Sequence, residues 1–270
     1  MKNILFLCVT YNSYKELLTY VGSIDRAAQL AADKFAVDVL VADNTTDGRQ
    51  VVDSHFDSLQ SFRVVPTGSN LGYFGGVKCV MSQVDDITRY DFVAISNVDL
   101  LMPEDFFGKL DALKVDEQVG WVANSILSGL EKRDRNPKIM RRYSEKRLKQ
   151  LRLLFRYPLL HQLYTRTLYL RKKHRPQLEA QEIYAGHGSF ILLTRRFVSA
   201  YPVIDYPVFL FCEEIYLAEL CRKAQLTVRY EPSVIIEDSE HCSTGKMGAF
   251  YYKCNYEAID YILKTYYADF

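Results

Sequence analysis

The chain has 270 residues, of which 49% are hydrophobic and 25% charged, with a formal net charge of +1. This ordinary globular composition fits one large core or two packed halves, and no apolar run approaches the length that a membrane span requires. Six scattered cysteines, with neither a C-x-x-C pair nor zinc spacing, argue against a zinc site and favour reduced thiols in a cytosolic protein.

Short apolar runs and helical patterns alternate over the first 110 residues. The opening run lacks the small-residue cleavage site of a signal peptide, so we expect a strand there. Strands are expected at Ile4–Val9, Val37–Val41, Phe62–Val65 and Phe92–Ser96, with a further candidate at Val119–Ala123. Helices are expected from Asn12 or Ser13 toward Ala32, after the Gly72–Gly76 turn, and from Pro103. This alternation predicts an α/β fold with a doubly wound, mostly parallel sheet.

The second half mixes strands with longer helices. The segment Gly186–Phe197 is typical of a strand that leads into a helix. Residues 226–236 are expected to form a strand, a turn and a second strand. Glu213–Ala224 is predicted to be an amphipathic helix, and Lys246–Tyr267 a helical tail.

A basic segment interrupts this order. Residues 132–175 hold 16 Lys and Arg against two acids, so the segment carries +14. The other 18 basic and 31 acidic residues give the remainder −13. Leu and Tyr residues are interleaved with the cations, so the segment is either a solvated basic face or a helical surface that lies on anionic lipid. No nucleic-acid-binding motif accompanies it, so we expect no nucleic-acid partner.

Polar groups follow the expected strands and the glycine turn at Val9–Ser13, Val41–Gly48, Asn70–Gly76 and Ser96–Asp99. Carboxyl ends of parallel strands share one sheet edge, where ligands bind in open α/β sheets. There Asp43 can accept from a base or a ribose, and the glycines let backbone N–H groups approach phosphate. Asp99 suits a divalent cation that bridges a diphosphate. Taken singly, these residues are also typical of turns. Asp99 on its own could simply cap the helix that is expected near Pro103.

In order and spacing, these motifs resemble those of the family-2 glycosyltransferases with the GT-A fold, especially the rhamnosyltransferase-like branch of bacterial polysaccharide synthesis. The segments that carry the resemblance, spread over nearly the whole chain, are Val9–Ser13, Asp43–Asp47, Asn70–Gly76, Asn97–Asp99, Gly188–Arg196, Phe209–Leu217 and His241–Thr244. The resemblance implies an inverting transferase that moves rhamnose, galactofuranose or a hexose from a nucleotide-diphosphate donor to a hydroxyl of a glycan acceptor, with Mg²⁺ or Mn²⁺ as cofactor.

The resemblance also assigns roles to residues. Asp99 would be a metal ligand, and His241 a late metal ligand or donor-phosphate contact, with Asp238 as its competitor. Glu214 would be the general base, with Glu213 as the alternative, although two acids also simply favour a first helical turn. The expected donor contacts are Thr10, Tyr11, Asn12, Asp43, Asn70, Gly72, Tyr73, Gly76, Lys78 and Asn97. The turn at His187 and Gly188 is expected to line the acceptor cleft.

Several positions depart from the family pattern. Glu214 replaces the usual Asp, Tyr216 replaces the second Asp of the E-D-x-D motif, Lys78 replaces an Asn, and Cys254 replaces an Arg. The main alternative is therefore a nucleotide-sugar-binding module of the same fold without turnover. A dinucleotide-dependent dehydrogenase is poorly supported, because no G-x-G-x-x-G follows the first strand.

We divide the chain into three parts of one integrated domain. Residues 1–125 would bind the nucleotide sugar, 126–180 form the basic helical insertion, and 181–270 bind the acceptor, carry the catalytic acids and end in helices. The resemblance places the protein in the cytoplasm or peripherally on the inner face of the cytoplasmic membrane. A lipid-linked acceptor would favour the membrane face. The sequence gives no signal of oligomeric state.

Overall fold

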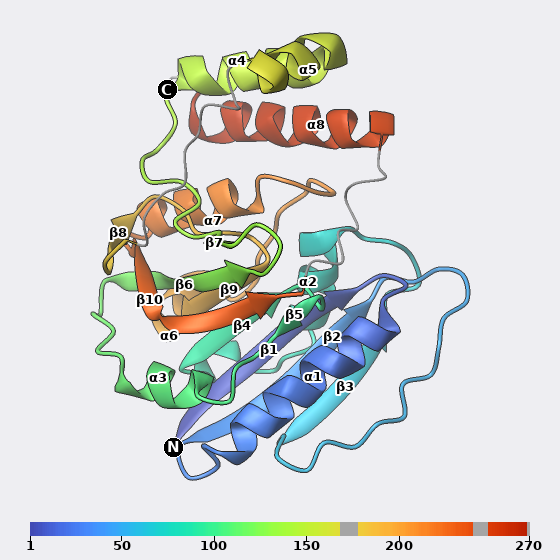
Figure 1. The fold of residues 1–270 in the computed structure, drawn as a ribbon, viewed down its shortest axis with the longest axis vertical. Helices are drawn as coiled ribbons and strands as arrows, with labels where there is room; N and C mark the ends of the chain where they lie inside the picture. Colours follow the sequence, from blue (N-terminus) through green and yellow to red (C-terminus); the bar gives the residue numbers. More distant parts are fainter. Residues whose placement is uncertain (168–177, 240–247, 269–270) are drawn as a thin grey trace.

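The computed structural model describes residues 1–167, 178–239 and 248–268, which form one α/β body around a ten-stranded sheet (Figure 1). Its strands are β1 (Lys2–Thr10), β2 (Phe35–Asp43), β3 (Ser61–Pro66), β4 (Phe92–Ser96), β5 (Leu100–Leu101), β6 (Val119–Ser128), β7 (Arg133–Asp134), β8 (Gln181–Ile183), β9 (Phe190–Thr194) and β10 (Thr227–Asp238). Its helices are α1 (Tyr14–Gln29), α2 (Tyr73–Met81), α3 (Phe106–Ala112), α4 (Glu145–Arg156), α5 (Pro158–Thr167), α6 (Arg195–Ala200), α7 (Glu213–Lys223) and α8 (Gly248–Tyr266), with a short 3₁₀ helix at Ile87–Arg89.

The strand order is β3-β2-β1-β4-β9-β6-β10-β5, with β7 beside β6 and β8 beside β10. β1 pairs in parallel with β2 and β4, β2 with β3, and β6 with β10. Every antiparallel pair among the described strands involves β5, β7, β8 or β9. The predicted α/β class, with a largely parallel central sheet, a helical basic insertion and C-terminal helices, is confirmed.

Strand β1 divides the core into two layers. Ile4, Phe6 and Cys8 join the cluster that includes α1 and α3, whereas Leu5 and Leu7 join the cluster that includes α2. All five side chains are at most 2% exposed, because alternate residues of a strand face opposite sides of the sheet and both sides are covered. A continuous apolar run is therefore the correct signal for this strand.

Two local predictions were wrong. The helix expected from Pro103 begins at Phe106, whose N–H donates to the Pro103 carbonyl at 3.1 Å, so the proline belongs to the preceding turn. Asp105 takes the N-cap position, so Asp99 does not cap this helix. Residues 226–236 do not form two strands, because β10 runs through them with an irregularity between Glu231 and Ile235. Pro232 lies in that irregularity, where the N–H it lacks is not needed for the ladder.

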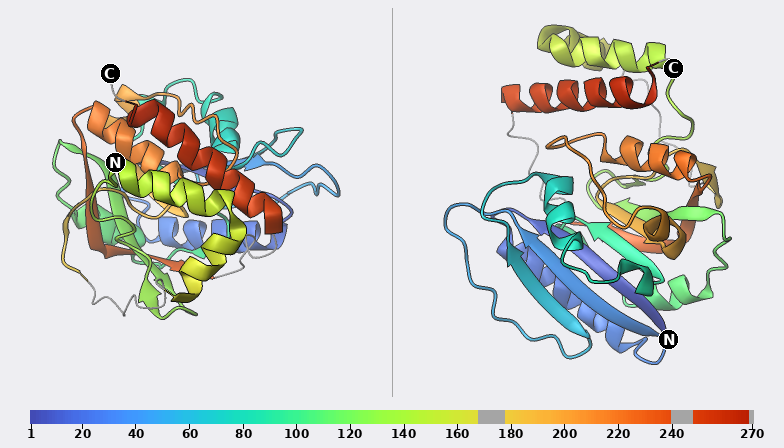
Figure 2. Two further views of the ribbon diagram at one scale, coloured as in Figure 1. Left: turned by 90° about the horizontal axis from the view of Figure 1, so that it is seen from above. Right: turned by 180° about the vertical axis from the view of Figure 1, so that it is seen from behind.

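Part of the basic segment forms an outer helical layer. α4 and α5 lie over α8, which in turn lies over α7, on the side of the molecule away from β3 (Figure 2). Ser144 caps α4 by accepting from the Arg147 N–H at 3.2 Å, and Leu148 is buried beneath the helix. Within the residues that the structure describes, no helix combines the length and apolar character that crossing a bilayer demands.

A backbone contact joins the N-terminal and C-terminal halves. Gly72, directly before α2, has φ +75°, and a Cβ built on it would lie 2.0 Å from the Phe209 carbonyl oxygen. The same carbonyl accepts a hydrogen bond from the Tyr73 N–H at 3.2 Å. Only glycine satisfies both the backbone conformation and this approach.

We predict that Gly72→Ala destabilises the fold by at least about 2 kcal/mol more than Gly68→Ala, because only the first adds an overpacking penalty to a left-handed backbone. Gly68 is the matched control, since its φ is +76° and nothing lies within 4 Å of its added Cβ. The two free energies of unfolding can be compared by urea denaturation. Equal losses in the two variants would contradict the role given to the Phe209 contact.

Candidate active site

The parallel strands bring the predicted polar segments to one edge of the sheet. Thr10 lies opposite Asp43 in the β1–β2 register, and Cys8 lies opposite Ser96 in the β1–β4 register. The glycine turn joins this edge because the Asn44 amide donates to the Gly72 carbonyl at 2.8 Å.

Asp43 is buried, and two hydrogen bonds within the protein orient its carboxylate. Oδ1 accepts from the Thr45 N–H at 3.0 Å, and Oδ2 accepts from the Tyr14 hydroxyl at 2.9 Å. A carboxylate offers about four acceptor positions, so each oxygen keeps capacity for a further donor. Thr45 also accepts from the N–H of Asn12, which has the left-handed φ of 55°. Contact between Asp43 and a base stays a prediction.

The other donor candidates on this edge differ in exposure. Tyr11 is 49% exposed, whereas Thr10 is buried and its Oγ1 has no hydrogen-bond partner among the described residues. Asn97 lies at the end of β4, where its N–H donates to the Ser189 carbonyl at 2.9 Å.

Two backbone N–H groups of the glycine turn already donate hydrogen bonds within the protein. The Gly72 N–H donates to the exposed Asn70 side chain at 3.1 Å, and the Tyr73 N–H is engaged by Phe209. A Cβ on Gly76 would lie 3.1 Å from Val9 Cγ1, so this glycine lets α2 approach the sheet. The expected contact of this turn with phosphate stays a prediction.

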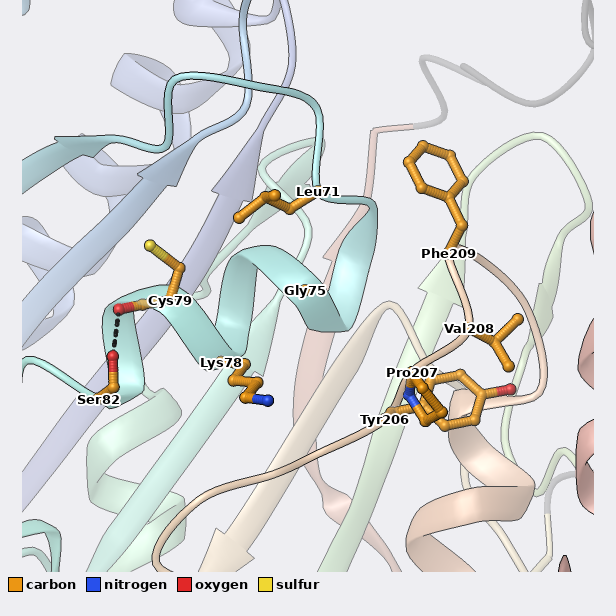
Figure 3. Close-up of a pocket in the computed structure, with 9 residues that line it drawn as sticks. All are labelled: Leu71, Gly75, Lys78, Cys79, Ser82, Tyr206, Pro207, Val208 and Phe209. Carbon is orange, nitrogen blue, oxygen red and sulfur yellow. Dashed lines mark hydrogen bonds between the residues drawn. The ribbon is translucent and has the colours of Figure 1, made fainter.

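Lys78 lies farther along α2 and faces the loop from Tyr206 to Phe209 (Figure 3). Its amino group forms an ion pair with Asp205 at 2.6 Å and borders a cavity of about 470 Å³. The residues that line the cavity are Leu71, Gly75, Lys78, Cys79, Ser82, Tyr206, Pro207, Val208 and Phe209. The described contacts of Lys78 are thus with this loop, and its expected donor contact stays a prediction.

Asp99 lies half-buried between the ends of β4 and β10. Its carbonyl accepts from the Ser239 N–H at 3.1 Å and from the Ser239 hydroxyl at 2.7 Å. Burial, and then the negative charge of Asp238, raise the pKa of the Asp99 carboxyl. Asp238 itself forms an ion pair with Arg135 at 2.6 Å.

The chemistry of these donors fits a divalent cation. The Asp99 carboxylate supplies hard oxygen ligands, and a cation would relieve its repulsion with Asp238. Among the described residues, however, no group of three or more His, Cys, Asp or Glu side chains is arranged to hold a metal ion. His241 lies outside the described residues. Asp99 would therefore share the ion with ligands that the protein does not supply, as carboxylates do for Mg²⁺ bound to phosphates.

The two predicted catalytic acids open α7 after a strained turn. Phe211 and Cys212 both have left-handed φ values, 76° and 62°, a conformation that costs about 1–3 kcal/mol per residue. Glu213 holds the turn, because its Oε1 accepts from the Phe211 N–H at 2.8 Å. Burial, followed by the charge of Glu214, raises the pKa of Glu213 to about 8. Glu214 is only half-buried, so it is the more accessible of the two acids.

The predicted acceptor turn lies between Glu214 and Tyr73, which is one of the predicted donor contacts. A Cβ on Gly188 would lie 3.9 Å from Glu214 Oε2, and the Gly188 carbonyl accepts from the Tyr73 hydroxyl at 2.9 Å. The structure thus brings together Tyr73, Gly188 and Glu214, which the sequence assigned to donor, acceptor and catalysis.

His187 is held as a neutral imidazole. Burial, and then the charges of Lys138, Arg135 and Arg133, lower its pKa. Its Nδ1 accepts from the Ser189 N–H at 3.2 Å, which assigns the ring proton to Nε2 and leaves that nitrogen as a hydrogen-bond donor.

The substituted positions Tyr216 and Cys254 belong to the core. The Tyr216 hydroxyl donates to the Asp205 carbonyl at 3.0 Å, and Tyr216 and Cys254 are at most 5% exposed. Tyr216 therefore packs in the interior, and its hydroxyl cannot stand in for a second carboxylate.

Sequence reasoning missed the residues that orient the site. Tyr14 orients Asp43, Arg135 neutralises Asp238, and Asn136 accepts from the His187 N–H at 2.7 Å. Arg135 and Asn136 lie in the basic segment, the part of the chain that is least similar to the family pattern. Of these three residues, only Tyr14 could have been found from the sequence, because it directly follows the Val9–Ser13 motif.

No protein-family model and no curated protein matches the chain. Solved structures with a similar fold include GalNAc-T7 with UDP, GalNAc and Mn²⁺, at 9% identity over 98% of this chain and 49% of that chain, with a TM-score of 0.56. A second is S. aureus TarS 1–349 in complex with UDP-GlcNAc, at 12% identity over 86% of this chain and 58% of that one, with a TM-score of 0.52. These neighbours are GT-A-type glycosyltransferases, and the chain shares their fold over about half of their length.

We predict that Glu213→Gln makes stability less dependent on pH. A carboxyl whose pKa is raised on folding favours the folded state fully below its unfolded value, near 4.5, and this contribution is lost as the pH rises to about 8. The variant cannot ionise but can still accept from the Phe211 N–H. Over this window the free energy of unfolding of the variant, relative to that of wild type, should rise by at most roughly 1.4 kcal/mol per pH unit.

Urea denaturation at pH 5, 6.5 and 8 checks this prediction, with Glu104→Gln as an exposed control. Parallel stability profiles for wild type and Glu213→Gln would mean that Glu213 ionises normally in the folded protein.

Proposed function

We propose that the protein is an inverting, metal-dependent glycosyltransferase that uses a nucleotide-diphosphate sugar. The observation that carries the proposal is the junction of Tyr73, Gly188 and Glu214, which sets a half-buried carboxylate beside the edge of the parallel sheet. The shared fold with GT-A glycosyltransferases, among them complexes with UDP, UDP-GlcNAc and Mn²⁺, supports the donor class and the metal.

In this proposal Glu214 accepts the proton of an acceptor hydroxyl as that oxygen attacks the anomeric carbon of the donor. The bond to the nucleoside diphosphate breaks on the opposite face, so the configuration inverts. Glu213 has a pKa raised to about 8 by burial and by the charge of Glu214, so it stays protonated at neutral pH and the role of base falls to the more accessible Glu214. Asp99 would hold Mg²⁺ or Mn²⁺, which when bound neutralises charge on the departing diphosphate.

We propose rhamnose, galactofuranose or a hexose as the transferred sugar, because the motifs resemble those of the rhamnosyltransferase-like branch. The acceptor would be a glycan hydroxyl in bacterial cell-surface polysaccharide synthesis, such as O-antigen or capsule. A lipid-linked acceptor would place the protein at the inner face of the cytoplasmic membrane, and the basic segment at residues 132–175 supports that position by its charge.

Glu214→Gln should keep donor affinity and lose turnover by about a hundredfold or more, because an amide cannot take the proton. Donor hydrolysis or transfer, measured beside calorimetric donor binding, separates the two effects. Glu213→Gln is the paired variant, and a larger loss of turnover there would assign the base to Glu213. A parallel fall of donor affinity and rate in Glu214→Gln would contradict its role as the base.

Asp99→Asn should abolish the part of donor binding that depends on Mn²⁺. A thermal-shift panel of nucleotide sugars with and without Mn²⁺ measures this, because a ligand at a hundred times its Kd stabilises the fold by about 2.7 kcal/mol. Asp105→Asn, at the start of α3, is the control that leaves the candidate site unchanged. A normal Mn²⁺ effect in Asp99→Asn would remove Asp99 from the metal site.

The second candidate function is a nucleotide-sugar-binding module without turnover. Tyr216 favours it, because its buried side chain occupies the position of the second acid of the family motif. Tight donor binding by wild type, with no hydrolysis or transfer in Mn²⁺, would decide for this candidate.

A further inference from the structure

The helical layer formed by α4 and α5 exposes large apolar side chains that the fold does not need. Leu148 is buried under α4, and Leu151 and Phe155 pack against the core. Other apolar residues of the same layer face outward. Their exposed fractions are 52% for Leu153, 48% for Tyr157, 80% for Leu159, 46% for Leu160 and 61% for Leu163.

Cations share this outward side of α4. Lys146, Lys149 and Arg156 are exposed, and with Leu153 they recur at intervals of three and four residues, which places them on one face of the helix. Lys149 also forms an exposed ion pair with Glu145 at 2.5 Å, a type of pair that contributes little to stability and that a phosphate can replace. The Arg156 guanidinium lies 5.9 Å from the ring centroid of Tyr157. We call the surface made by Lys146, Lys149, Leu153, Arg156, Tyr157, Leu159 and Leu160 the α4–α5 face.

Other cations of the basic segment serve the fold. Arg152 pairs with Asp260 of α8 at 2.6 Å, and Arg147 donates to the Tyr164 hydroxyl at 2.9 Å. The first contact holds α4 onto α8, and the second joins α4 to α5. Only part of the segment is therefore available to a partner, and that part combines positive charge with leucines.

We propose that the α4–α5 face lies on an anionic lipid bilayer. Phosphate headgroups would take the three cations, while Leu153, Leu159 and Leu160 would enter the interface below them. A merely solvated face gains nothing from these leucines, and clustered exposed apolar residues mark interaction sites. Helix α4 itself carries five Lys and Arg against one Glu, and this excess of positive charge would turn the α4–α5 layer toward a negative surface.

The same features disfavour other occupants. A second copy that used the same face would bring cations against cations. Single-stranded nucleic acid would use aromatic side chains as stacking platforms, whereas leucines dominate the apolar part of this face. The inference concerns where the protein sits and does not depend on sugar transfer, so vesicle binding and enzyme activity can fail separately.

The test is co-sedimentation of the full chain with vesicles of phosphatidylcholine alone or mixed with phosphatidylglycerol. Wild type should bind only the anionic vesicles, and less at high salt. A variant with Lys146, Lys149 and Arg156 changed to Gln should bind about a hundredfold more weakly. The matched control changes Lys15, Arg26 and Lys114, exposed cations of the N-terminal half, to Gln and should bind nearly as well as wild type.

A second variant, Leu153→Gln with Leu159→Gln, should also bind more weakly, which separates lipid insertion from charge attraction alone. Equal binding by wild type and the Lys146, Lys149 and Arg156 variant would overturn the proposal, as would no binding by any protein. A concentration-dependent dimer that this variant abolishes, without vesicle binding, would assign the face to a second copy instead. Circular dichroism confirms that each variant is folded.

Discussion

The approach of the Phe209 backbone to Gly72 sets the geometry of the candidate site. Its carbonyl leaves room for no Cβ on Gly72 and also takes the Tyr73 N–H, so the start of α2 and this loop are fixed together. Two residues later the loop turns through the left-handed Phe211 and Cys212 into α7. The position of Glu213 and Glu214 is thus tied, through this backbone contact, to the start of α2.

The site also depends on how charge is compensated. Arg135 balances Asp238, burial keeps His187 neutral, and the raised pKa of Glu213 leaves it protonated at neutral pH. Asp99 has no ion pair among the described residues, and its pKa is raised by burial and by Asp238. A bound cation would offset that penalty, which links the electrostatics of this edge of the sheet to the proposed metal.

The sequence could predict what local pattern determines. The strand expected at Phe92–Ser96 has those bounds in the structure, because an apolar run between turn residues leaves little freedom. The helix at Phe106 was placed too early, since Pro103 is equally suited to a turn before a helix. Long-range pairs escaped prediction: Lys78 meets Asp205, and Arg152 meets Asp260, through contacts that no local spacing encodes.

In the proposed mechanism, Asp99 and Glu214 face one bound donor. A crystal structure with a UDP-sugar and Mn²⁺ tests it most directly. We expect the metal on an Asp99 oxygen and the sugar between the diphosphate and Glu214, near the Gly188 turn. A nucleotide bound in the cavity beside Lys78, with no metal at Asp99, would contradict it.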